Sequence, residues 1–144
     1  MQQFTMMIVA VLIALCAGCG GSGGGGVTTP SAGGPHALGA RGVPGGTVTV
    51  TSDGALTPGA ATLFHITLGG GLTPTQVAAW IGTEPVDGAV GTAAVPTATG
   101  AGTYDVSLLM PATIPVGSHV WVRLVFTDGS VIETGADDFP LVRP

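Results

Sequence analysis

The feature that most constrains the fold of this chain is a strict alternation of apolar and polar residues in its C-terminal part. A period of two places successive side chains on opposite faces of a strand, whereas a helix needs apolar residues every three or four positions. The alternation is clearest in residues 118–127, where every second residue is large and apolar. It recurs in 47–51, 61–68, 76–81 and 103–110 and, more weakly, in 91–95. No segment shows a convincing helical period, so the sequence predicts an all-β fold.

Glycines and prolines separate the predicted strands and indicate turns. The sharpest hairpin signal is Asp128-Gly129, which follows the strongest predicted strand. We expect a bulged three-residue loop here, because a shift of one residue would turn a charged side chain onto the core face. The expected register places Phe126 opposite Ile132 and Val125 opposite Glu133.

About seven short strands in residues 47–144 predict a single β-sandwich. Their turns and closing strand carry a recurrent set of residues: Val77, Gly82, Pro111, Pro115, Gly117, Val120, Val122, Asp128, Gly129, Phe139 and Leu141. In this order the segment resembles bacterial immunoglobulin-like domains of the IPT/TIG type. The resemblance implies an immunoglobulin-like sandwich, in which Trp80 stands at a position that is commonly buried.

A second constraint lies at the N-terminus, where every residue from Met6 to Ala17 is apolar. This run is too short for a transmembrane helix, which needs about 17–25 residues, but it suits the core of a signal peptide, about 7–15 residues long. The sequence Leu15-Cys16-Ala17-Gly18-Cys19 resembles the lipobox of bacterial lipoproteins. The resemblance implies cleavage before Cys19 and attachment of lipid to its thiol. Cys16 is a poorer candidate, because Leu15 stands where the peptidase requires a small side chain.

Glycine dominates the segment that follows, residues 20–46. Such a segment has little to bury and behaves as a flexible tether with a reach of roughly 30 Å. The sequence therefore predicts three parts: a signal peptide (1–18), a lipidated cysteine with its tether (19–46) and the immunoglobulin-like domain (47–144).

The charges argue against several classes of function. Three arginines and eight acidic residues give a net charge of −5, which disfavours nucleic acid as a partner. No serine lies in a G-x-S-x-G motif, and no set of residues suggests a nucleophile with its base, so we expect neither an enzyme nor a cofactor. Asp137-Asp138 is expected to be a solvated loop, with a contribution to calcium binding as the lesser alternative.

Two candidate sites remain. His119, Trp121 and Arg123 alternate on the non-core face of the strongest predicted strand, and tryptophan and arginine are typical interface anchors. The alternatives are that Trp121 is buried beneath a loop or the other sheet, and that Arg123 forms a cross-strand ion pair with Glu133. If the strands of His65 and His119 paired, their imidazoles would converge as a copper site, with Met110 as a soft neighbour.

These observations predict a membrane-anchored lipoprotein that presents a non-catalytic immunoglobulin-like module in the bacterial envelope. Its partners would be the membrane, through Cys19, and an envelope protein. The residue after the cysteine is Gly20 rather than the aspartate that retains enterobacterial lipoproteins in the inner membrane, which favours the outer membrane. The alternative function is a periplasmic carrier of copper or a small ligand that uses His65 and His119.

Overall fold

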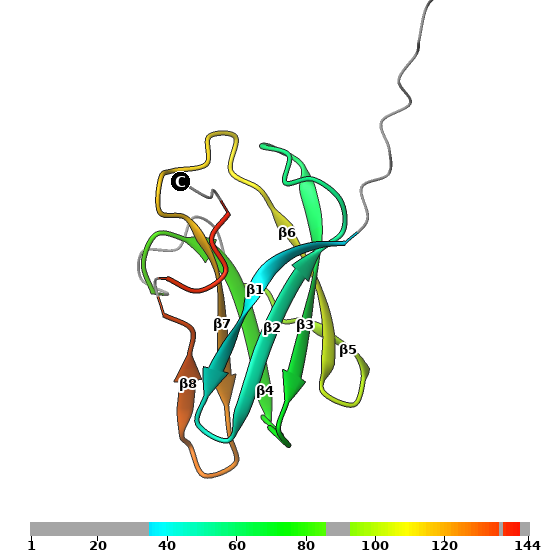
Figure 1. Cartoon of the computed structure of the whole chain (residues 1–144), viewed down its shortest axis with the longest axis vertical. Coiled ribbons are helices and arrows are strands. Elements are labelled where there is room, and N and C mark those ends of the chain that lie inside the picture. The colour runs from blue at the N-terminus through cyan, green and yellow to red at the C-terminus, as the bar shows by residue number, and fades with distance from the viewer. Residues whose placement is uncertain (1–34, 86–92, 136, 142–144) are drawn as a thin grey trace, which may run out of the picture.

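The computed structural model describes residues 35–85, 93–135 and 137–141, and this part of the chain contains eight strands and no helix (Figure 1). Since it contains no helix, none of the described residues forms a helix that could cross a membrane. The strands are β1 (His36–Val43), β2 (Gly46–Ser52), β3 (Ala61–Gly69), β4 (Gln76–Gly82), β5 (Thr97–Gly100), β6 (Thr103–Leu109), β7 (His119–Val125) and β8 (Val131–Glu133).

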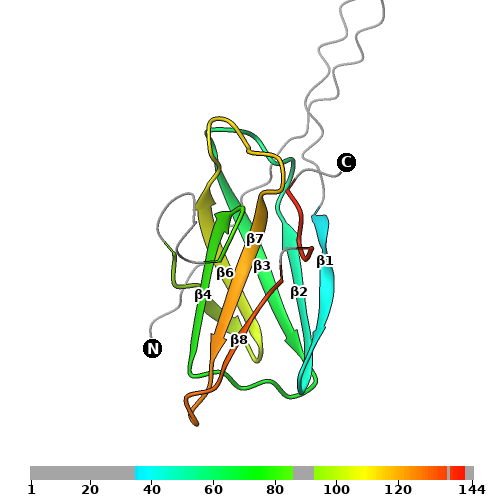
Figure 2. The same ribbon diagram turned by 90° about the vertical axis from the view of Figure 1, so that its left-hand side faces the viewer.

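Two antiparallel sheets pack face to face (Figure 2). The larger sheet has the order β1-β2-β3-β6-β5, and the smaller has the order β4-β7-β8. The predicted all-β sandwich is therefore confirmed.

The core lies between the sheets and is built from the alternating apolar residues that predicted the strands. In β3, Phe64 and Ile66 are fully buried, and in β7 Val120, Val122 and Leu124 face them from the other sheet. Because every second residue points inward, each strand contributes a short row of aliphatic or aromatic side chains to one continuous cluster.

The domain begins earlier than the sequence predicts. Strand β1 lies within residues that we expected to be tether, and it pairs with β2 over its whole length. Leu38 is buried in the core, and Gly39 lies against the ring of Phe139. The expected boundary at residue 47 is thus wrong. Residues 36–43 are rich in glycine and contain a single large core residue, so their strand pattern is weak.

The predicted weak strand at 91–95 is only partly testable, because residues 91 and 92 lie outside the described residues. Ala94 makes an isolated bridge to Ala79 of β4, but it belongs to no strand. The next strand along the chain is β5, at the edge of the larger sheet.

The β7–β8 hairpin has the predicted three-residue loop but a different register. The Phe126 amide donates to the Ser130 carbonyl, which leaves residues 127–129 in the loop. Val125 therefore faces Val131, and Arg123 faces Glu133. The expected pairing is wrong by two positions. A shift of two keeps every side chain on the same face, so the apolar pattern alone does not distinguish the two registers.

The C-terminal segment 137–141 closes one side of the sandwich between β1 and β7. Phe139 is buried, and its carbonyl accepts a hydrogen bond from the Val120 amide. The side chain of Asp138 is only 8% exposed and pairs with Arg41 of β1 at 3.5 Å. The expectation of a solvated loop is therefore wrong for Asp138, which fastens the C-terminal segment to the first strand, whereas Asp137 is exposed.

Candidate functional site

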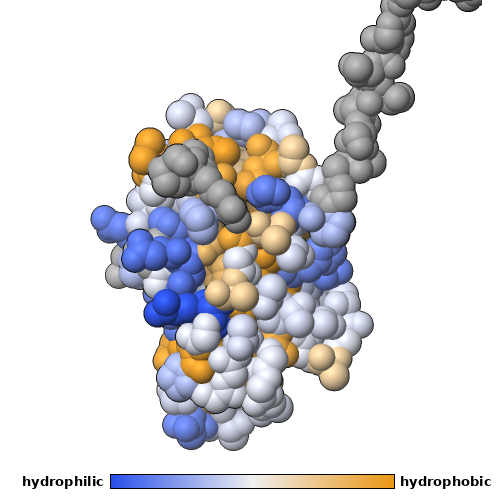
Figure 3. Space-filling view, viewed as in Figure 1, coloured by the Kyte–Doolittle hydropathy of each residue, from blue (hydrophilic) through white to orange (hydrophobic). Residues whose placement is uncertain are grey.

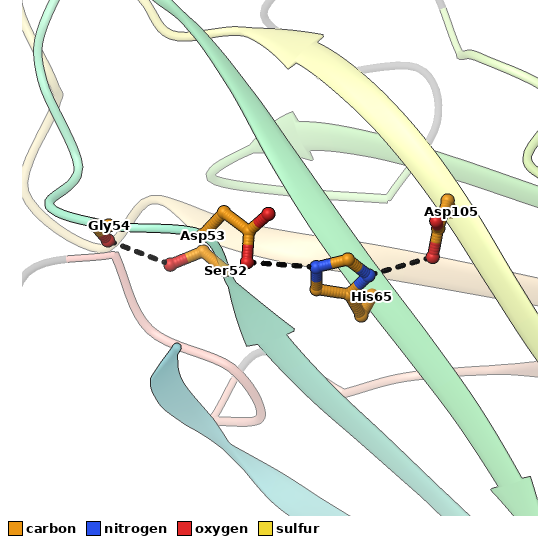
Figure 4. Close-up of polar contacts among 5 residues, drawn as sticks. All are labelled: Ser52, Asp53, Gly54, His65 and Asp105. Carbon is orange, nitrogen blue, oxygen red and sulfur yellow. Dashed lines mark hydrogen bonds and ion pairs between the residues drawn. The ribbon is translucent and has the colours of Figure 1, made fainter. Parts of the chain in front are cut away.

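An Asp-His-Asp cluster lies on the outer face of the larger sheet (Figure 4). His65 stands in the middle of β3, directly opposite Asp105 on the adjacent β6. Asp53 follows the end of β2, where its amide donates to the Leu63 carbonyl and so holds the turn beside β3. These three residues come from different segments of the chain, and the pairing of β2, β3 and β6 brings them together.

Each imidazole nitrogen of His65 faces a different carboxylate. Nδ1 lies 2.7 Å from Oδ1 of Asp105, and Nε2 lies 3.0 Å from Oδ1 of Asp53. Only the protonated imidazolium can donate to both acids at once, because neutral histidine has a single ring N–H. The hydrogen bonds to Asp105 and to Asp53 accordingly raise the pKa of His65 above its ordinary value of 6.5.

This arrangement favours the protonated form of His65 and leaves neither ring nitrogen free. A general base needs a free ring nitrogen within reach of a nucleophile, but both nitrogens of His65 are engaged by acids. The two carboxylates approach from opposite sides of the ring (Figure 4), so the three side chains do not converge on a common point. Among residues 35–85, 93–135 and 137–141, no group of three histidine, cysteine or acidic residues is arranged to hold a metal ion.

The cluster predicts a pH dependence of stability. Because the folded-state pKa of His65 is raised, its stabilising effect is fully present below about pH 6.5 and is lost as pH rises through the folded-state value. We expect the free energy of unfolding of the wild type, relative to His65→Gln, to be constant below about pH 6.5 and to fall as the pH rises above it through the folded-state pKa. The change should stay below about 1 kcal/mol, because the His65 side chain is 33% exposed. Urea titrations of both proteins across this range measure it, and a difference that is constant with pH would contradict the assignment.

The predicted copper site is not formed. His65 lies in the larger sheet, whereas His119 begins β7 of the smaller sheet, and the two strands do not pair. Met110 is 1% exposed and belongs to the core. The prediction assumed that two mid-strand histidines belong to neighbouring strands, and that assumption is wrong.

The predicted patch on β7 has the expected face but not the expected accessibility. Trp121 is only 3% exposed. Its ring stacks on that of Trp80, with centroids 6.1 Å apart and an interplanar angle of 4°. The Trp121 Nε1–H donates to the Gly82 carbonyl at 3.0 Å. Trp80 is buried as predicted, but it lies on the outer face of the smaller sheet and not between the sheets. Neither indole ring is available as an exposed anchor.

Arg123 completes this outer face. Its guanidinium lies 5.5 Å from the centroid of the Trp80 ring, and its Nη2 lies 2.6 Å from Oε2 of Glu133 on β8. His119 packs its ring edgewise against Trp121. The Arg123–Glu133 ion pair, the alternative to a binding role, is therefore confirmed. Together these contacts fix the arginine over the indole and make the face a structural one.

Comparisons with protein families, with curated proteins and with solved structures gave no match. The resemblances to the lipobox and to IPT/TIG domains therefore stay predictions.

Proposed function

We propose that this protein is a lipid-anchored component of the bacterial envelope whose folded part is a non-catalytic interaction or spacer module. The observation that carries the proposal is the order of its parts. An apolar run over residues 6–17 leads into small residues and Cys19, and a glycine-rich segment then leads to a self-contained β-sandwich. Lipid on Cys19 would attach the domain to a bilayer without a spanning helix, since two or more acyl chains anchor a protein durably.

The chemistry of the described residues supports a module rather than an enzyme. The cluster around His65 has both ring nitrogens bound to carboxylates, and the aromatic pair of Trp80 and Trp121 is buried. What the domain presents is therefore two sheet faces and two sets of loops, which suits binding to an envelope protein or spacing of the chain from the membrane. Gly20 favours the outer membrane as the site of the anchor.

The proposal is tested by comparing Cys19→Ala with the matched variant Cys16→Ala. We expect the wild type and Cys16→Ala to sediment with the envelope fraction, because cleavage before Cys19 removes residue 16 and the lipid is attached at Cys19. Cys19→Ala should carry no lipid, and it should therefore lack the shift in electrophoretic mobility that the lipid causes. Fractionation followed by immunoblotting measures both properties, and equal behaviour of the two variants would refute lipidation at Cys19.

A further inference from the structure

The chain enters the sandwich at one particular end. His36, the first residue of β1, is paired with Ser52 at the end of β2. Ala61 at the start of β3 is paired with Leu109 at the end of β6. The β2–β3 loop and the β6–β7 loop therefore lie at the same end as the start of β1, and Figures 1 and 2 show them there at the top of the domain. We call this the entry end, made of residues 53–60 and 109–118.

The two loops of the entry end are almost without charge, and an exposed acid outside them, Glu84, follows the end of β4 at the same end of the sandwich. Residues 54–60 and 109–118 contain no charged side chain, and the carboxylate of Asp53 is bound to His65. Val116 is 94% exposed and Leu109 is 70% exposed. Figure 3 shows hydrophobic surface gathered over the upper end of the domain, around the β6–β7 loop. Two of the four large apolar side chains that are exposed among the described residues therefore lie at this end, where contact with an apolar environment would remove them from water.

The loops of the entry end are fixed in place. The Gly59 amide donates to the carbonyls of Met110 and Pro111, which ties the β2–β3 loop to the β6–β7 loop. The Ser118 amide donates to the Pro115 carbonyl in a tight turn with Val116 at its tip. Val116 is therefore exposed at the tip of a turn whose backbone is held by hydrogen bonds.

We propose that the entry end rests on the bilayer that holds the anchor, with Val116 and Leu109 entering its interfacial region. This inference rests on the proposed function. Only a short segment separates Cys19 from Pro35, where the described chain begins. Fifteen residues span at most roughly 50 Å in any conformation, so the entry end is the end of the domain that the anchor keeps nearest to the lipid surface. Tethering keeps the effective concentration of that end at the membrane high, and a weak insertion is then sufficient.

The opposite end of the domain lies farther from the anchor than the entry end does. It carries the loops at Pro44-Gly45, at residues 70–75 and at residues 126–130, including the acidic Asp128. A groove of about 660 Å³, lined in part by Leu72, Phe126 and Ile132, opens there. With the entry end on the bilayer, this groove faces away from the lipid. The net charge of −5 favours a zwitterionic lipid surface over an anionic one, which would repel the domain.

Two matched probes distinguish the two ends in the full lipidated protein. Thr113 and Thr127 are both exposed loop threonines, one at each end. Thr113→Cys or Thr127→Cys supplies the only free thiol after Cys19 is acylated, and each is labelled with an environment-sensitive fluorophore. The labelled proteins are reconstituted into vesicles of phosphatidylcholine and phosphatidylethanolamine that contain spin-labelled quencher lipids. We expect at least twofold greater quenching at position 113 than at position 127, and a loss of that difference when Val116→Asp is added.

The outcomes separate the two claims. Flotation of the vesicles shows first whether the protein is anchored. If it does not float with them, the proposed function is wrong and the inference is wrong with it. If it floats but position 113 is quenched no more than position 127, or if Val116→Asp changes nothing, the inference alone is overturned. Because Val116 is almost fully exposed, the aspartate does not disturb the core.

Discussion

Replacing Phe64 with alanine is expected to lower the free energy of unfolding by about 3–5 kcal/mol. Phe64 is 0% exposed and lies in β3, the central strand of the larger sheet, between β2 and β6. Its ring fills the space between the sheets, and truncation leaves a cavity that the paired strands on both sides cannot close. Since small domains are stable by only about 5–15 kcal/mol, this variant should lose a large share of the total.

The control for this prediction is Leu109→Ala at the end of β6. Leu109 is also a large apolar residue of the larger sheet, but its side chain is mostly exposed, so its loss should change stability by no more than about 0.5 kcal/mol. Urea or thermal unfolding of both variants gives the comparison. Similar losses for the two positions would mean that the core does not lie between these sheets.

The second large effect is expected at Gly70, in the turn after β3. Gly70 has a φ of 76°, and a Cβ at this position would lie 2.5 Å from the Cα of Gly46 and 2.7 Å from the carbonyl oxygen of Gly45. Alanine here must both adopt a left-handed conformation and push away the backbone of the β1–β2 turn. We expect Gly70→Ala to cost at least about 3 kcal/mol, because the left-handed conformation alone costs about 1–2 kcal/mol.

The neighbouring glycine provides a matched control. Gly71 has a φ of 82°, but a Cβ there would meet no atom within 4 Å. Gly71→Ala should therefore show the conformational cost alone, about 1–2 kcal/mol. The difference between the two variants in the denaturant midpoint measures the backbone contact between the β1–β2 and β3–β4 turns. Equal midpoints would show that these turns do not pack as described.

Much of the fold follows from local pattern in the sequence. The alternation in 61–68 and 118–127 reflects one buried and one outward face, and β3 and β7 form at these places. Strand β1 was missed because its pattern of small and glycine residues does not differ from that of a linker. Its place in the sheet depends on pairing with β2 and on contacts with Phe139, neither of which local sequence encodes.

The polar cluster was missed for a related reason. The alternation identifies His65 as a mid-strand histidine, but its partners Asp53 and Asp105 belong to other segments of the chain, and Asp105 is distant in sequence. Their contact depends on which strands are adjacent and in which register, and a period of two determines neither. Because strand adjacency does not follow from the alternation, the sequence also allowed the strand of His119 to pair with that of His65. Knowledge that β3 pairs with β6 would have put Asp105 opposite His65 and predicted the ion pair instead of a copper site.

For Trp121, the sequence predicts the face of the strand but not whether that face is exposed. Sequence alternation assigned Trp121 to the face opposite the core, which is correct, but exposure does not follow from the face alone. Stacking with Trp80 and the cover from Arg123 bury this side of the smaller sheet as well. A strand with large residues on both faces indicates burial on both sides, and residues 118–127 carry that signal.

We propose that lipid on Cys19 holds the domain at a membrane, and the mass of the protein extracted from the envelope tests this most directly. We predict an intact mass that corresponds to a chain beginning at Cys19 plus a diacylglyceryl group and an amide-linked acyl chain. The N-terminal proteolytic peptide should carry the whole of this added mass. A chain that retains residues 1–18, or one that begins at Cys19 without added lipid, would contradict the account.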